Sequence, residues 1–234
     1  RMAATRLPGK PLLKINNLSI ISHVFKRAEE ANIGEVVVAT EDQEILADVL
    51  KNGGKAILTS SDHKTGTDRV FEAYRELNIK NIDYIINLQG DEPDISKDDI
   101  IKLNNLMINN ESEIGTLAAK IQSVKILNDT NVVKVTTEKK LEENNFSRAL
   151  SFTRKNLSVD KKNIYHHIGI YAYKVNILEK FVNLEQTNNE KKNKLEQLRA
   201  LDNKLKINIA LAKSSPIGVD TKEDYLAIKK IMEY

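Results

Sequence analysis

Three cations stand close together at the start of the chain. Arg1, Arg6 and Lys10 lie in the segment R-M-A-A-T-R-L-P-G-K-P-L, which also contains small residues, Gly and Pro. Small side chains let backbone N–H groups approach an anion, and fixed cations neutralise the charge of a polyphosphate. The segment therefore indicates a triphosphate-binding loop, and the alternative is a basic surface loop at a frayed terminus.

An acidic turn could supply a ligand for the metal ion that accompanies a triphosphate. Asp91 stands in Q-G-D-E-P (89–93), directly after an apolar run. Gly gives close backbone access at this point, and Pro turns the chain away. Magnesium prefers a few carboxylates together with phosphate oxygens and water, so an Asp here suits a metal–triphosphate complex. The alternative is that D-E-P only begins a helix.

Other polar segments could recognise the rest of a ligand. In D-H-K-T-G-T-D-R (62–69), Gly and Thr enter a predicted helix and offer donors and acceptors for the edge of a base. A turn with an N-cap is the alternative. His166 and His167 are adjacent, but neighbours on a strand point to opposite faces and cannot both bind one metal ion. G-V-D-T (218–221) precedes the last predicted helix and is typical of an N-cap.

These motifs need secondary structure to position them. Apolar periodicity in the first half predicts helices at 18–31, 43–52 and 68–77, and buried strands at 35–40, 56–59 and 83–88. Apolar strands separated by helices predict a parallel sheet that binds ligands at the carboxyl ends of its strands. After about residue 113 strands dominate, at 114–121, 132–137, 149–153, 168–173 and 207–212, with exposed helices within 174–205 and a terminal helix at 222–233. Asn-rich stretches such as 104–105 are expected at helix ends or turns.

Composition excludes several classes of protein. The 234 residues include 36 Lys and Arg against 33 Asp and Glu, and the resulting net charge of +3 argues against general nucleic-acid binding. The absence of Cys excludes disulfides, thiolate metal sites and a Cys nucleophile. No apolar run approaches the roughly 20 residues that span a bilayer, so we expect no membrane insertion and a cytoplasmic protein.

Together these motifs resemble the sugar-activating cytidylyltransferases, and most closely the branch that activates 3-deoxy-manno-octulosonate (Kdo). Besides the first loop, the matching segments are Q-G-D-E-P, D-H-K-T-G-T-D-R, F-T-R (152–154), H-H-I-G-I-Y-A-Y (166–173), L-E-Q-L-R (195–199) and G-V-D-T. The resemblance covers essentially the whole chain. It implies a Rossmann-like α/β nucleotidyltransferase fold with a mostly parallel sheet and a smaller mixed α/β lobe.

The resemblance also implies how the chain is divided. Within a single domain, 1–234, residues 1–113 would bind CTP, 114–213 would bind the sugar and dimerise, and 214–234 would supply a metal ligand and the terminal helix. A buried strand would precede the first loop, and this sequence contains none. We therefore expect the natural chain to begin further upstream, and the present chain to be less active and less stable than one that includes that strand.

The implied activity converts CTP and Kdo to CMP-Kdo and pyrophosphate for lipopolysaccharide biosynthesis, in a homodimer. The resemblance assigns catalytic roles to Lys10, Arg1, Asp91 and Asp220, of which Asp91 and Asp220 would hold Mg²⁺. It assigns nucleotide binding to Arg1, Arg6, Lys10, Thr67, Arg69 and Gln89, and sugar binding to Arg154, His167, Tyr171, Glu196 and Gln197. No general base is evident, and a metal-bound Kdo hydroxyl of lowered pKa would remove the need for one.

The sequence departs from the family after Arg154, where K-N-L-S (155–158) replaces a loop that usually contains Ile-Pro. Two alternatives to the Kdo assignment therefore stay open. One is activation of a related acid sugar, either amino-Kdo or a sialic acid. The other is a non-catalytic nucleotide-binding homologue.

Overall fold

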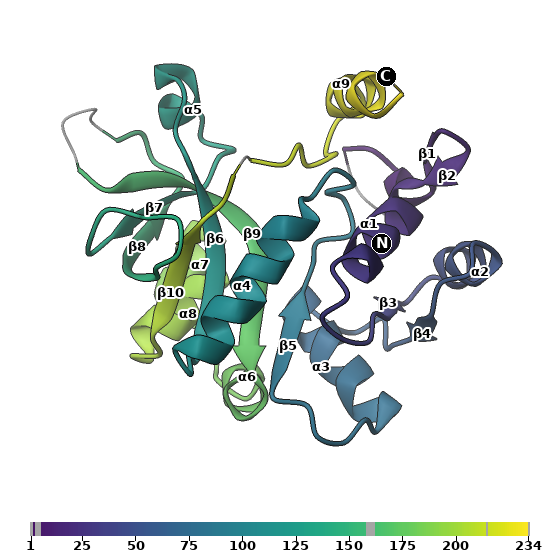
Figure 1. Cartoon of the computed structure of the whole chain (residues 1–234), viewed down its shortest axis with the longest axis horizontal. Coiled ribbons are helices and arrows are strands. Elements are labelled where there is room, and N and C mark those ends of the chain that lie inside the picture. Colours follow the sequence, from purple (N-terminus) through teal and green to yellow (C-terminus); the bar gives the residue numbers. More distant parts are fainter. Residues whose placement is uncertain (1, 3–5, 158–161, 214, 234) are drawn as a thin grey trace. The chain divides into compact units, whose positions relative to one another are not determined.

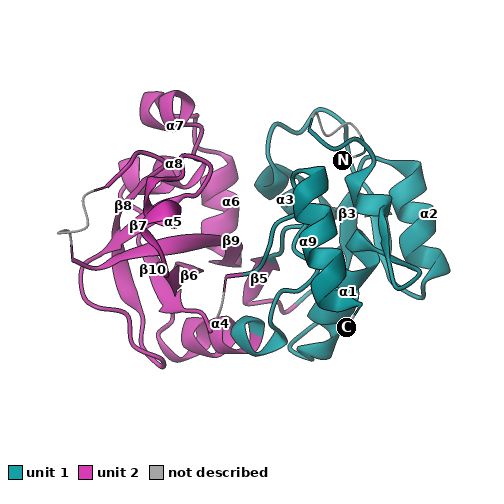
Figure 2. Ribbon diagram, turned by 90° about the horizontal axis from the view of Figure 1, so that it is seen from above, with its two compact units in different colours: residues 1–80, 87–100, 216–234 teal, residues 81–86, 101–215 magenta. Residues whose placement is uncertain are grey.

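The computed structural model describes residues 2, 6–157, 162–213 and 215–233 (Figure 1). The chain forms two compact units (Figure 2). Unit 1 comprises residues 1–80, 87–100 and 216–234, and unit 2 comprises residues 81–86 and 101–215. Each unit is therefore assembled from segments that are distant in sequence.

Unit 1 consists of helices around a short parallel pair of strands. Its elements are η1 (Lys10–Leu12), β1 (Lys14–Ile15), β2 (Leu18–Ser19), α1 (Ile20–Glu30), β3 (Val38–Thr40), α2 (Gln43–Lys51), β4 (Ala56–Leu58), α3 (Gly66–Leu77) and α9 (Lys222–Met232). β3 and β4 pair in parallel, from Val38 opposite Ala56 to Thr40 opposite Leu58. The helices predicted at 18–31, 43–52, 68–77 and 222–233 are confirmed to within about two residues at each end.

Two apolar clusters hold unit 1 together. In the first, Ile21 and Phe25 of α1 pack against Ile45 and Val49 of α2. In the second, Ile15 and Ile20 pack with Val219 and Ile228 from the other end of the chain. This second cluster fixes the start of α9, and with it the G-V-D-T turn, beside residues 15–20.

Unit 2 is built on one six-stranded sheet. Its strands are β5 (Tyr84–Asn87), β6 (Ile114–Lys120), β7 (Lys134–Thr137), β8 (Ser147–Thr153), β9 (Ile164–Lys174) and β10 (Ile207–Leu211), in the order β5-β9-β6-β10-β8-β7. The helices are α4 (Lys97–Asn109), α5 (Val124–Asn128), α6 (Val175–Val182), α7 (Asn188–Asn193) and α8 (Gln197–Asp202). β5 and α4 each have residues in both units.

The sheet of unit 2 is mixed, which corrects the expectation of a mostly parallel sheet. β10 pairs with β6 in parallel, but β6–β9, β8–β10, β7–β8 and β7–β9 are antiparallel. For β7 and β8 the reason is local, because no helix lies between them at 138–146 and strands joined by a short connection pair antiparallel.

The helices of unit 2 are more buried than the sequence suggested. The segment 174–205 was expected to form exposed helices, yet Leu178 and Phe181 are buried and so are Glu190 and Arg199. Gly115 on β6 packs so closely on α4 that an added Cβ would lie 2.4 Å from the Met107 sulfur. Helices of unit 2 therefore contribute buried residues, and α4 packs directly on β6.

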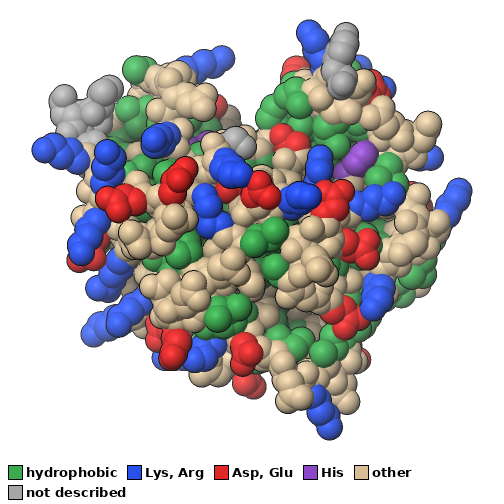
Figure 3. Space-filling model, viewed as in Figure 1, with side chains coloured by type: hydrophobic (Ala, Val, Ile, Leu, Met, Phe, Trp, Pro, Cys, Tyr) green, Lys and Arg blue, Asp and Glu red, His purple; other side chains and the backbone are tan. Residues whose placement is uncertain are grey.

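On the face shown in Figure 3, Lys and Arg side chains are interspersed with Asp and Glu. No helix in the described part of the chain is long and apolar enough to cross a membrane.

Candidate functional site

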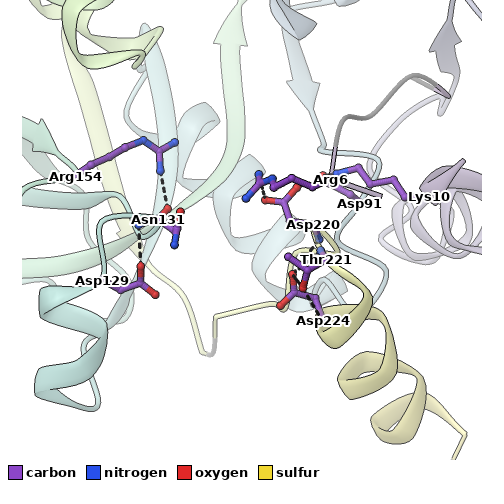
Figure 4. Close-up of polar contacts among 9 residues, drawn as sticks. All are labelled: Arg6, Lys10, Asp91, Asp129, Asn131, Arg154, Asp220, Thr221 and Asp224. Carbon is purple, nitrogen blue, oxygen red and sulfur yellow. Dashed lines mark hydrogen bonds and ion pairs between the residues drawn. The ribbon is translucent and has the colours of Figure 1, made fainter. Parts of the chain in front are cut away.

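Unit 1 brings together four of the predicted phosphate- and metal-binding residues, which we call the phosphate-side cluster: Arg6, Lys10, Asp91 and Asp220 (Figure 4). The Lys10 ammonium donates to Asp91 Oδ2 at 2.6 Å and to Asp220 Oδ1 at 3.0 Å. Arg6 donates to the other oxygen of Asp220 at 2.7 Å. One ammonium therefore joins two carboxylates from turns about 130 positions apart.

Backbone geometry sets the position of each partner in the phosphate-side cluster. Gly9 takes a left-handed conformation (φ 71°) just before η1, which starts at Lys10. Gly90 lies against α1, where an added Cβ would be 2.8 Å from Ile21 Cδ1. The Val219 N–H then donates to the Asp91 carbonyl at 2.9 Å and joins the two acidic turns. The cluster is thus fixed by backbone contacts as well as by its ion pairs.

A capping box at the start of α9 orients Asp220. The Thr221 hydroxyl accepts from the Asp224 N–H, and the Asp224 carboxylate accepts from the Thr221 and Asp220 N–H groups at 2.8 and 3.1 Å (Figure 4). This arrangement satisfies N–H groups at the helix start that would otherwise lack partners. Thr221 therefore caps the helix, while the side chain of Asp220 points to Lys10 and Arg6.

The electrostatics of Lys10 follow from this geometry. Burial, the largest influence, lowers the pKa of its ammonium, but Asp91 and then Asp220 raise it by more, so the net pKa lies above the usual value. The Lys10 side chain is only 14% exposed, whereas that of Arg6 is 59% exposed. The Lys10 ammonium is thus largely buried and fixed by its ion pairs, whereas the Arg6 side chain is exposed to solvent. Arg1, the third predicted cation, lies outside the described residues.

Glu92 is a buried carboxyl group that sequence reasoning did not single out. Burial raises its pKa to about 8, with smaller contributions from Asp91 and Asp94. Its Oε2 atom has no hydrogen-bond partner among the described residues. Burial therefore favours the protonated form of Glu92 at neutral pH, and Asp91 is the acid of this turn that forms ion pairs. The only sequence signal was the position of Glu92 beside Asp91, which did not reveal its burial.

The phosphate-side cluster has the chemistry to hold a divalent cation. Asp91 and Asp220 supply hard carboxylate oxygens, and these already converge on one cation, the Lys10 ammonium. Within the described ranges, no group of three or more Asp, Glu or His residues could hold a metal ion. Two carboxylates suit an ion that takes its remaining ligands from phosphate and water, as Mg²⁺ does.

The other predicted nucleotide-binding residues lie at or near the start of α3 and after β5: Thr67, Arg69 and Gln89. Thr65 caps α3 by accepting from the Asp68 N–H, and Thr67 is 2% exposed within the first turn. The Arg69 guanidinium donates to Thr59 Oγ1 at 2.5 Å and to the Ser60 carbonyl at 3.3 Å, and it also pairs with Glu41. Arg69 therefore ties α3 to the loop after β4, while Gln89 lies half-buried beside Gly90.

Unit 2 carries the predicted sugar-binding residues, of which we call Arg154, His167 and Tyr171 the sugar-side cluster. The Arg154 guanidinium donates to the Asn131 carbonyl at 2.6 Å (Figure 4). The ring of Phe152, two residues earlier, packs edge-on against His167 with ring centroids 5.2 Å apart, and His167 in turn lies 5.4 Å from Tyr171. Strands β8 and β9 thus hold two of these residues by ring packing.

His167 is held in its neutral form. Burial lowers its pKa to about 3, with smaller effects from His166 and Arg154. Its Nε2 lies 3.1 Å from Thr116 Oγ1, and that hydroxyl donates to the Ile170 carbonyl at 2.5 Å. Because the Thr116 proton is used there, His167 Nε2–H donates to Thr116. His167 can therefore orient a ligand but cannot act as a cation at neutral pH.

Tyr171 has a buried hydroxyl with no hydrogen-bond partner among the described residues. Burial raises the pKa of this hydroxyl well above its usual value, and Tyr173 and Glu196 add to the effect. A buried hydroxyl without a partner is unfavourable by about 1–3 kcal/mol. A ligand that offered an acceptor at this point would remove that cost.

Glu196 and Gln197 stand at the first turn of α8, which is fixed by a buried ion pair. Arg199 donates from Nε and Nη2 to the two carboxylate oxygens of Glu190, at 2.9 and 2.7 Å. Its guanidinium also lies over the Phe181 ring, 4.8 Å from the centroid. Arg199 therefore anchors this short helix to α6 and α7 and so places Glu196 and Gln197.

The fold and the residues of unit 1 define the class, an α/β nucleotidyltransferase. A model of the cytidylyltransferase family matches residues 1–207, and the chain belongs to that family. A 3-deoxy-manno-octulosonate cytidylyltransferase of Afipia carboxidovorans is 43% identical, covering 99% of this chain and 94% of the relative. The enzyme of that name from Thermodesulfovibrio yellowstonii is 44% identical, covering 99% and 95%.

Solved structures agree with this assignment. CMP:2-keto-3-deoxy-manno-octonic acid synthetase, solved in complex with CTP, is 34% identical with a TM-score of 0.89, covering 99% of this chain and 95% of that chain. Apo-UDP-glucose pyrophosphorylase has a TM-score of 0.70 at 12% identity, covering 97% and 90%, a similarity that concerns the fold alone.

Proposed function

We propose that this protein transfers CMP from CTP to Kdo and releases pyrophosphate, and so supplies CMP-Kdo for lipopolysaccharide assembly. The observation that carries the proposal is the position of Lys10 between Asp91 and Asp220. An ammonium and two carboxylates are what a metal–triphosphate complex requires. The proposal is supported by full-length relatives of that name and by the similarity to a synthetase solved with CTP.

On the phosphate side, binding CTP requires an exchange of partners. Lys10 and Arg6 would leave the carboxylates and donate to triphosphate oxygens, and we assign Arg1 to the same role. Asp91 and Asp220 would then hold a divalent ion, which we propose is Mg²⁺. When bound, that ion neutralises phosphate charge and lowers the pKa of the attacking hydroxyl.

For the base, we assign contacts to Thr67 and Gln89, which stand at a helix start and a strand end. Arg69 already donates to Thr59 and Ser60 and pairs with Glu41. Its contribution to nucleotide binding would therefore be to keep the loop after β4 in place beside α3.

On the sugar side, the groups match an acid sugar with many hydroxyls. Arg154 would bind the sugar carboxylate by charge-assisted hydrogen bonds. The buried Tyr171 hydroxyl and neutral His167 would bind sugar hydroxyls, as would Glu196 and Gln197 at the start of α8.

In the reaction, the anomeric hydroxyl oxygen of Kdo forms a bond to the α-phosphorus and releases its proton to water, while the bond from that phosphorus to the oxygen that bridges to the β-phosphorus breaks. Pyrophosphate is the leaving group. The chain contributes position and charge neutralisation, with Lys10 facing the phosphate charge that develops. We propose further that the enzyme is a homodimer and works in the cytoplasm, where its substrate CTP is found.

The decisive test measures pyrophosphate release by the full chain with CTP, Kdo and Mg²⁺. Parallel reactions replace Kdo by amino-Kdo or a sialic acid, replace CTP by UTP, or omit Mg²⁺. The proposal predicts turnover with CTP and Kdo and little in the other reactions. Faster turnover of another acid sugar would reassign the substrate, and CTP binding without turnover of any sugar would indicate a non-catalytic homologue.

A further inference from the structure

Lys134 on β7 is a lysine with no exposed surface. Its relative exposure is 0%, and it belongs to the run V-V-K-V (132–135), where an apolar residue would be expected. Burying an ammonium is costly unless its donors are satisfied. The Lys134 ammonium must therefore find hydrogen-bond acceptors inside the protein.

The Lys134 ammonium holds two backbone carbonyls. Nζ donates to the Asp129 carbonyl at 2.8 Å and to the Arg154 carbonyl at 3.1 Å. The Arg154 guanidinium donates back to the Asn131 carbonyl, and the Asn131 N–H donates to Asp129 Oδ1 at 2.8 Å (Figure 4). The Arg154 guanidinium is thus bonded directly to the 129–131 turn. The Arg154 carbonyl is connected to the same turn through Lys134 Nζ.

Strand pairing puts Lys134 beside both parts of the sugar-side cluster. It lies opposite Thr153, which precedes Arg154, and opposite His166, which precedes His167. Directly opposed residues have Cβ atoms about 5 Å apart. A substitution at Lys134 would therefore act directly on its two partner strands, β8 and β9.

Charge supplies a third argument. Burial lowers the pKa of Lys134; Asp129 raises it and Arg154 lowers it again, which shows that the two cations repel each other. An anion bound by Arg154 would relieve that repulsion. Lys134 itself has no exposed surface with which to touch the anion.

We infer that Lys134 is a positioning residue that fixes Arg154 for the carboxylate of the sugar substrate. The inference rests on the proposed function and extends it, because it explains how an otherwise solvated arginine is held ready for an acid sugar. Loss of the Lys134 ammonium should therefore weaken binding of the sugar and not of CTP, since the phosphate-side cluster lies in unit 1.

The test is a double-mutant cycle in the full chain, with Lys134→Met, Arg154→Met and the combined variant. Lys134→Met should raise the KM for Kdo about tenfold, while kcat and the KM for CTP change less than about twofold. In the Arg154→Met background, Lys134→Met should add less than about twofold, because the residue it positions is gone. Equal effects in both backgrounds would overturn the inference.

Lys102→Met is the matched control. Lys102 is on α4, and its Nζ donates to the Leu211 carbonyl at 3.0 Å, so it has the same chemistry in the same unit away from Arg154. It should leave the KM for Kdo unchanged. An increase equal to that of Lys134→Met would show that any lysine-to-carbonyl contact in unit 2 has this effect, and would overturn the inference.

Two further measurements separate the outcomes. Lys134→Gln keeps an N–H donor and should show a smaller rise in the KM for Kdo. If both Lys134 variants fail to fold, the role of Lys134 is structural and the inference is wrong.

Calorimetric binding of Kdo tests the site without turnover. A wild-type chain that turns over Kdo while Lys134→Met keeps its KM contradicts only this inference. A wild-type chain that neither binds nor turns over Kdo contradicts the proposed function as well.

Discussion

In the phosphate-side cluster, charged side chains from loops and turns hold one another, whereas the sugar-side residues are held by rings and backbone carbonyls of a sheet. Lys10 and Arg6 form ion pairs with Asp91 and Asp220, and under the proposed function they would exchange these partners for phosphate oxygens. In contrast, His167 packs between the rings of Phe152 and Tyr171, contacts that involve no charged side chain. Because the proposed function requires the first region to exchange partners and leaves the packing of the second in place, substitutions in the two regions should affect different observables.

The largest expected effect is on stability in unit 2. Arg199→Met should lower the free energy of unfolding by about 3–5 kcal/mol, because it leaves the carboxylate of Glu190 buried without its partner. Both side chains are at most 5% exposed. Urea denaturation measures the change.

The matched control is Arg27→Met, which breaks the exposed pair with Glu30 on α1. This change should cost less than about 1 kcal/mol. If the two variants lose similar amounts of stability, the sugar side does not depend on buried contacts and the contrast between the regions fails.

The next largest effect is on catalysis in unit 1. Lys10→Met should lower kcat on the order of a hundredfold, because the ammonium would meet phosphate charge that grows in the transition state. The pyrophosphate-release assay measures it. Lys14→Met, an exposed lysine on β1 four residues away, should keep the wild-type kcat. A Lys10 variant with most of its kcat would remove this residue from the phosphate site.

A pH effect follows from neutral His167. Its pKa is about 3 in the folded chain and about 6.5 when unfolded. Between these values the unfolded state binds a proton that the folded state does not, so the stabilisation is complete above about pH 6.5 and is lost as the pH falls toward 3. We expect a loss of about 2 kcal/mol in the free energy of unfolding between pH 7 and pH 5.

Urea denaturation at several pH values measures this loss. The variant His167→Gln keeps the other titrating groups and should lack this part of the slope. Identical pH profiles for the variant and the wild type would show that His167 is protonated equally in both states.

The smallest effect concerns the capping box that orients Asp220. Thr221→Ala should lower the free energy of unfolding by about 1 kcal/mol and should also raise the KM for CTP. Thr187→Ala removes the cap of α7 in unit 2 and should cost similar stability with no change in that KM. If the two variants had equal KM values for CTP, the capping box of α9 would have no role in orienting Asp220 for CTP binding.

Much of this fold was predictable because periodicity and burial coincide. The helices α1, α2, α3 and α9 and all the strands of unit 2 lie where apolar spacing placed them. α4 was missed because Asn104 and Asn105 interrupt its apolar face with turn-forming residues, and burial of residues such as Leu103 and Met107 outweighs that local preference. Mixed strand direction was missed because spacing along one strand does not give the direction of its neighbour.

The same limit applies to the site. The loop with Lys10 and the turn with Asp91 stood out by their residue types, whereas Asp220 was assigned by the family resemblance; the structure brings these three together. Their roles in catalysis stay predictions. Lys134 and Glu92 were not found, because a lysine between valines or a second acid in a turn is ordinary in a sequence. Only the tertiary packing, which removes both from water, makes them unusual.

The phosphate-side cluster has equal numbers of opposite charges, two cations against two carboxylates. A triphosphate diffusing toward these four side chains therefore meets little long-range attraction from them, unlike a site lined by cations alone. The contribution of these four side chains to its association rate should therefore vary little with ionic strength. Residence time, rather than speed of capture, would then decide how well the protein competes for its nucleotide.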